Sequence, residues 1–190
     1  RSEKLMRDRI DEIPDGTYSF TDYMDSDGLD EGQLTLDIKL TVKGSNITFD
    51  LSGSSPECRG PFNSPYSNTV TGTMIAVKHV FWDIPINSGC FEPFDWIIPK
   101  GSMLNPREPR PVSGATTESC NMIVSTTLGA LAKAVPGRVP AGYFATGSNI
   151  CLGGNHPDYG EYATLLLVGG GMGGNPDGDG LNNGCPGVGG

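Results

Sequence analysis

Residues 33–51 read QLTLDIKLTVKGSNITFDL and decide the fold, because apolar and polar residues alternate on both sides of a turn signal. The alternating apolar residues predict a strand with one buried face: Leu34, Leu36, Ile38, Leu40 and Val42. Lys43-Gly44-Ser45-Asn46 is typical of a hairpin turn. The return strand continues the inward face with Ile47, Phe49 and Leu51. This stretch therefore predicts an antiparallel meander with one wet face.

The flanking sequence adds a third strand to the meander and predicts three helices and two further strands. Upstream, residues 1–12 carry a short charged helix pattern, and the alternation in Thr17–Met24 predicts a strand. Downstream, helical spacing predicts helices over Thr69–Asp83 and Glu118–Val135. Two further strands are expected: a short one at Phe94–Ile98, and a continuous apolar one at Tyr162–Val168, buried on both faces. The predicted class is α+β, an antiparallel meander followed by helices packed on a mixed sheet.

Composition restricts the kinds of partner. The chain has 190 residues, 36% hydrophobic and 18% charged, with a formal net charge of −9. This acidic balance argues against nucleic acid or an anionic membrane surface as a partner. The sequence has no apolar run near the ~20 residues that span a bilayer. Its five cysteines form no C-x-x-C pair, so we expect reduced thiols and a cytoplasmic location.

Both ends suggest a piece of a larger subunit. The chain begins with Arg1 in a charged segment and closes in a glycine-rich run over 169–190. We expect residues 1–168 to belong to one domain. We expect 169–190 to continue into an absent C-terminal part, because such a tail cannot bury enough apolar surface to fold alone.

The glycine run at 169–174 satisfies G-x-G-x-x-G, but its context does not support a dinucleotide site. Such a site needs a helix that starts at the third glycine, and residues 175–180 (NPDGDG) cannot start one. Close packing of the backbone against substrate or a neighbouring strand explains these glycines better.

Metal sites find little support. The acidic turns at 25–28 and 177–180 lack EF-hand spacing and are interpreted as surface turns. His79 lies mid-helix and is expected to be partly buried and structural. His156 lies on a predicted loop beside an acid and is a candidate for proton transfer. With only these two histidines, an all-protein zinc site is not expected.

The polar segment at 50–63 (DLSGSSPECRGPFN) is the strongest candidate site, because loops mounted on a rigid sheet commonly carry polar chemistry. Its candidate residues, with others elsewhere in the chain, are Ser52, Ser54, Arg59, Asn63, Asn87, Arg110 and Glu118. An arginine here can bind an amide or carboxylate ligand with two hydrogen bonds. The alternative is that these side chains only cap their own turns.

Several motifs in one order resemble the hydantoinase B/oxoprolinase family. They are Ile13–Tyr18, Asp27-Gly28, Phe49–Pro56 with Gly60-Pro61-Phe62-Asn63, Pro85–Gly89, Pro99–Pro106, Leu128–Leu131, the Gly169–Gly174 run and Asp179-Gly180. The chain departs from the family pattern at Ser113–Glu118 and at Glu161–Val168, which leaves room for a carboxylase-like subunit. It resembles only the middle-to-late part of such a subunit, with 1–168 as part of the hydantoinase B-like domain.

The resemblance implies part of a catalytic subunit of an ATP-dependent cyclic-amide hydrolase, of the hydantoin or 5-oxoproline type. The implied partner is an ATPase subunit of the hydantoinase A type, which holds ATP and Mg²⁺. No cofactor is expected in this chain, and the metal-binding positions of some members should lie upstream of Arg1. Ser52, Ser54, Arg59, Asn63 and Asn87 are the implied catalytic residues. Two alternatives remain: a subunit of a ketone carboxylase of the acetone or acetophenone type, and a non-catalytic module that docks the ATPase.

Overall fold

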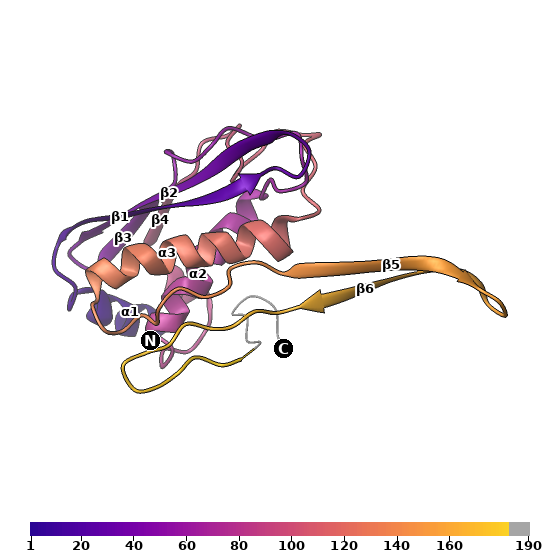
Figure 1. Cartoon of the computed structure of the whole chain (residues 1–190). Coiled ribbons are helices and arrows are strands. Elements are labelled where there is room, and N and C mark those ends of the chain that lie inside the picture. The colour runs from indigo at the N-terminus through magenta and orange to yellow at the C-terminus, as the bar shows by residue number, and fades with distance from the viewer. Residues whose placement is uncertain (183–190) are drawn as a thin grey trace.

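The computed structural model describes residues 1–182, in which a four-stranded mixed sheet carries its helices on one face (Figure 1). The strands are β1 (Gly16–Ser26), β2 (Glu31–Lys43), β3 (Asn46–Asp50) and β4 (Phe94–Ile97), in that spatial order. β1, β2 and β3 pair antiparallel, and β4 adds parallel to β3. The predicted meander and mixed sheet are therefore confirmed.

The helices surround the inner face of this sheet. They are α1 (Ser2–Ile10), α2 (Tyr66–Val80) and α3 (Cys120–Ala134), with a short 3₁₀ turn, η1 (Ser88–Phe91), and a π-helical turn, η2 (Ala115–Ser119). α2 begins three residues before the predicted start and ends three residues before the predicted end. The predicted helix over 118–135 is α3, with its first residues in η2 instead of in the α-helix.

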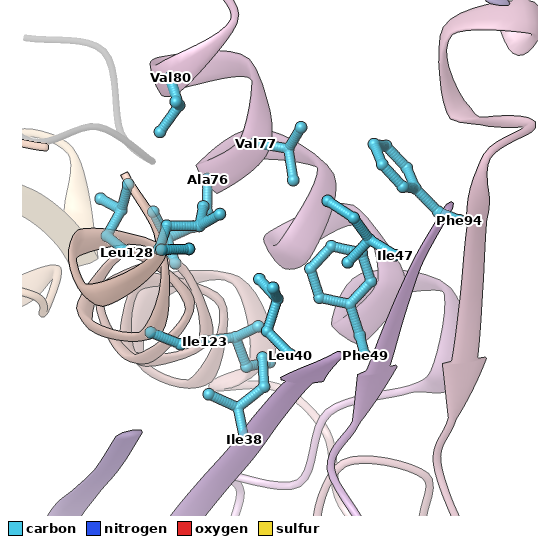
Figure 2. Packing of buried hydrophobic residues seen from close by; sticks show 14 of the residues in the cluster. Ile38, Leu40, Ile47, Phe49, Ala76, Val77, Val80, Phe94, Ile123 and Leu128 are labelled. Atoms are coloured by element: carbon cyan, nitrogen blue, oxygen red, sulfur yellow. The ribbon is translucent and has the colours of Figure 1, made fainter. Parts of the chain in front are cut away.

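The core lies between the sheet and the helices α2 and α3. Strand residues such as Ile38, Leu40 and Phe49 point toward Val77 of α2 and Ile123 of α3 (Figure 2), and all five are buried. The alternation on β2 explains this arrangement, since its even-numbered residues 36–42 are buried while Lys39 is exposed. The alternation thus determines which face of the sheet carries the helices.

Two more strands form a separate sheet that extends away from this body (Figure 1). They are β5 (Ser148–His156) and β6 (Gly160–Val168), an antiparallel hairpin. β6 confirms the strand predicted at 162–168, but the expected burial on both faces is wrong for the described chain, because every residue of β6 is exposed. β5 was not predicted, and it places His156 at a strand end instead of on a loop.

Among the described residues, none of the helices is long and apolar enough to cross a membrane.

Candidate functional site

The polar segment that follows β3, Leu51–Asn63, is here called the bend, and it is fastened to β2. The Ser54 hydroxyl accepts a hydrogen bond from the Asp37 amide at 3.1 Å and donates to the Asp37 carbonyl at 3.2 Å. The Ser55 hydroxyl accepts from the Thr35 amide at 2.8 Å, and the Ser55 amide donates to the Thr35 carbonyl at 2.9 Å. These serines satisfy strand groups that a regular ladder would pair, so the bend is a rigid extension of the sheet.

Asn63 fastens the bend to itself and to a distant loop. Its side chain is fully buried, and its amide oxygen accepts from the Cys58 amide at 2.9 Å. Its amide nitrogen donates to the carbonyls of Cys58, Gly60 and Pro111 at 3.0–3.1 Å. Since both polar atoms of the side chain bind backbone groups, Asn63 acts in this chain by positioning the bend.

Asp27 is a buried anion under the bend. Its carboxylate accepts from the amides of Asp30 at 2.6 Å, Leu29 at 2.8 Å and Gly60 at 2.7 Å. The hydrogen bonds from Asp30 and Leu29, followed by that of Gly60, lower the pKa of Asp27 to about 2. The interpretation of residues 25–28 as a surface acidic turn is wrong for Asp27, which is only 3% exposed. The fold brings this carboxylate to Gly60, which is distant in sequence. The residue types alone could not predict this contact.

Two polar side chains of the bend reach solvent. Ser52 is exposed, and its amide is held by the Asp50 carboxylate at 2.9 Å. Arg59 is 68% exposed at its side chain and forms an ion pair with Asp30 at 2.8 Å. Such surface pairs are weak, so the Arg59 guanidinium is free to exchange this partner for a ligand. Within the bend, Ser52 and Arg59 are therefore the predicted site residues that can meet a ligand directly.

The bend borders two hollows, one lined in part by the turn that joins β1 to β2 and the other in part by the end of β1. Cys58 and Arg59 line one of about 350 Å³, together with Asp30 and Glu31. Burial raises the pKa of the Cys58 thiol, which makes it a poor nucleophile near neutral pH.

The second hollow, of about 400 Å³, is lined by Phe62 of the bend. Its wall also includes Glu118, which accepts a hydrogen bond from the Thr146 hydroxyl. Glu118 lies in η2, and π-helical turns of this kind occur frequently at functional sites. The Ser119 hydroxyl binds the Phe62 carbonyl, so η2 and the bend are fixed to each other.

The remaining candidates lie apart from these hollows. Asn87 is exposed, and its side chain donates to the Ser2 hydroxyl of α1 at 2.8 Å, so the structure does not place it with the bend. Arg110 binds Glu57 at 3.3 Å. The Arg107 amide, followed by Arg110, lowers the pKa of the Glu57 carboxyl. Arg110 thus supports the bend from outside.

Within residues 1–182, no group of three or more histidine, cysteine or acidic side chains could hold a metal ion. His79 is partly buried on α2 and its ring nitrogen contacts the Ile75 carbonyl at 2.8 Å, in keeping with the structural role expected for it. His156 packs its ring against Tyr159, with ring centroids 4.7 Å apart.

Comparison with known families now identifies the chain. The family described as hydantoinase B/oxoprolinase matches residues 1–189. The chain belongs to this family. A putative D-/L-hydantoinase B-type subunit from Pseudomonas sp. (strain NS671) is 37% identical over 153 residues, which is 74% of this chain and 26% of that protein. The 5-oxoprolinase of Dictyostelium discoideum is 35% identical over 142 residues, 69% of this chain and 11% of that protein. The chain thus spans about a quarter or less of these two relatives.

Solved structures agree with the family assignment. The ATP-dependent caprolactamase of Pseudomonas jessenii superimposes with a TM-score of 0.81 at 26% identity, covering 97% of this chain and 33% of that one. An acetone carboxylase superimposes with a TM-score of 0.82 at 19% identity, covering 97% of this chain and 27% of that one, which supports the fold alone. The fold is therefore that of a portion of larger hydantoinase B-family subunits.

Proposed function

We propose that this chain is part of the catalytic subunit of an ATP-dependent cyclic-amide hydrolase, of the hydantoin or 5-oxoproline type. The observation that carries the proposal is the match along 97% of the chain to a caprolactamase, an ATP-dependent enzyme whose name denotes a cyclic amide. The named relatives include a hydantoinase subunit and a 5-oxoprolinase, which are also cyclic-amide enzymes by name.

The chemistry explains why such a subunit works with an ATPase partner of the hydantoinase A type. Resonance makes an unstrained amide resist water. Transfer of a phosphoryl group from ATP to the amide oxygen releases ADP and makes the amide carbon electrophilic. Water then attacks that carbon and the ring C–N bond opens, which leaves a free amine and an acyl phosphate. A second water hydrolyses the acyl phosphate to a carboxylate and inorganic phosphate. Magnesium and ATP belong to the partner in this scheme, and the ring-opening step belongs to the subunit that contains this chain.

The residues of the bend suit the second step. Arg59 offers a planar cation for phosphoryl or acyl oxygens, and Ser52 offers an exposed hydroxyl elsewhere on the bend. Asp27, Ser54 and Asn63 hold the backbone beneath them. Donors mounted on a backbone held in this way stabilise developing charge with little reorganisation of that backbone during reaction.

A ketone carboxylase is the second candidate. The acetophenone carboxylase delta subunit of Aromatoleum aromaticum is 29% identical over 127 residues, which is 66% of this chain and 18% of that protein. Such an enzyme would use ATP to activate an enolate oxygen instead of an amide oxygen.

The test is substrate-dependent ATP hydrolysis by the subunit containing this chain, assembled with its ATPase partner. Phosphate release would be followed with hydantoin, 5-oxoproline and ε-caprolactam, and with acetone or acetophenone plus bicarbonate. Stimulation by a cyclic amide, together with the ring-opened product, is the expected result. Stimulation by the ketones alone would establish the carboxylase. Stimulation by neither class would contradict both, and would favour an assembly role.

A further inference from the structure

The hairpin Ser148–Val168, here called the arm, lacks the support that a two-stranded sheet needs. β5 and β6 pair only with each other among the described strands, and the arm extends away from the body (Figure 1). An isolated two-stranded hairpin is at best marginally stable in water. Its long, regular ladder from Ser148↔Val168 to His156↔Gly160 therefore calls for further packing.

Both faces of the arm carry large apolar side chains. The register places Ile150 opposite Leu166 on one face, and Leu165 and Leu167 on the other. All four side chains are about half exposed, at 47–56%. A strand that faces water on one side alternates, as β2 does, whereas strands apolar on both faces are typical of sheets covered on both sides.

The charge pattern also indicates a protein occupant. Residues 148–155 and 162–168 contain no charged side chain, and the acidic residues of the arm, Asp158 and Glu161, lie at its turn. An uncharged apolar surface of this extent is suited to burial inside a protein layer.

The two segments at the base of the arm are fixed to each other. The Ala141 amide donates to the Gly174 carbonyl at 2.8 Å, and the Phe144 amide donates to the Gly171 carbonyl at 3.1 Å. A Cβ on Gly173 would lie 1.8 Å from the Ala141 carbonyl oxygen, so only glycine permits this approach. The expected close packing of the glycine run is thus confirmed against a neighbouring segment.

We propose that the arm forms inner strands of a larger sheet, and that its occupant is the polypeptide that hydantoinase B-family subunits contain outside the region matched by this chain. The caprolactamase match covers 97% of this chain, so it includes most of the arm, and it leaves two thirds of that chain to cover it. A second copy of this chain is disfavoured because it would add another net charge of −9.

Complementation in trans tests this proposal. The probe is a tagged beta chain of the Pseudomonas jessenii caprolactamase from which the region that matches this chain has been deleted. The preparation used is one that binds this deleted region when the region is added back as a separate polypeptide. We expect it to retain the 190-residue chain and to slow amide exchange in β5 and β6 by about tenfold or more. The double variant Leu165→Lys/Leu167→Lys should lower retention about tenfold or more, while Leu29→Lys, exposed on the body, should not.

Two results would overturn the proposal. One concerns binding: the probe binds its own deleted region but not this chain, or it binds the double variant as tightly as the unchanged chain. The other is an arm already protected from exchange in the isolated chain, with sedimentation showing a dimer, since the occupant would then be a second copy. An unchanged melting temperature of the body shows that the double variant folds. The readout is binding, so it is independent of the proposed catalytic function.

Discussion

Gly60 donates its amide to the Asp27 carboxylate at 2.7 Å, and the two backbones lie so close that no side chain fits between them. A Cβ on Gly60 would lie 1.8 Å from the Asp27 carbonyl oxygen. This contact joins the β1–β2 turn to the bend across 33 residues of sequence. The two segments that border the candidate site therefore form one unit.

Gly60→Ala should destabilise the fold by about 1–3 kcal/mol, because the backbone must separate to admit a methyl group. Urea denaturation followed by circular dichroism measures this loss. Gly142→Ala is the matched control, since a Cβ there meets nothing within 4 Å. Equal stability of the two variants would show that the close approach does not constrain the fold.

Asp27→Asn should cost about 1–3 kcal/mol, because a neutral amide oxygen is a weaker acceptor than the carboxylate. The variant should also change the pH dependence. The folded pKa of about 2 lies below the ordinary 3.8, so the carboxylate stabilises the fold fully above pH 3.8 and loses that effect as pH falls toward 2.

Denaturation midpoints between pH 2 and pH 6 test this expectation, with the exposed Asp25→Asn as control. The unchanged protein and Asp25→Asn should lose stability together on acidification. A curve for Asp27→Asn that runs parallel to theirs would rule out Asp27 as the titrating group.

Asn63→Ala should destabilise the fold by about 2–4 kcal/mol, because it leaves buried backbone groups of the bend without a partner. Asn87→Ala, which removes one part-buried hydrogen bond to Ser2, should cost about 1 kcal/mol. Thermal melts of the two variants provide the comparison. Similar melting temperatures would argue that water replaces the Asn63 amide and that the bend is not held by it.

The fold of the body was predictable because its strands face a core on one side only. The alternation of Leu36, Ile38 and Leu40 marks both the strand and its buried face. β5 gave no such signal, since Gly153, Gly154 and Asn155 have low strand propensity and pair only because β6 lies beside them. The burial predicted for β6 failed because the described residues include nothing that covers it.

The candidate site was predictable in composition but not in arrangement. The segment around Ser54 and Asn63 could be recognised as a dense polar loop after a strand. Contacts with Asp37 and Pro111 decide which side chains hold the backbone and which reach solvent. These residues are distant in sequence, so the local sequence does not predict the contacts. The burial of Asp27 was not predicted because its partner Gly60 contributes only a backbone amide. Every residue except proline has such an amide, so the residue type does not indicate the contact.

The proposed role of the bend as a wall of the catalytic site is tested most directly through Arg59. Arg59→Ala removes a surface ion pair, so the free energy of unfolding should change by no more than about 0.5 kcal/mol. Arg9→Ala, which removes two exposed ion pairs from α1, with Asp83 and with Glu12, is the control.

The decisive measurement is cyclic-amide-dependent ATP turnover by the assembled enzyme carrying each substitution. The account predicts that Arg59→Ala lowers kcat/KM about tenfold or more, that Arg59→Lys recovers part of the loss, and that Arg9→Ala behaves as the unchanged enzyme. Full turnover in Arg59→Ala, equal to that of Arg9→Ala, would contradict it.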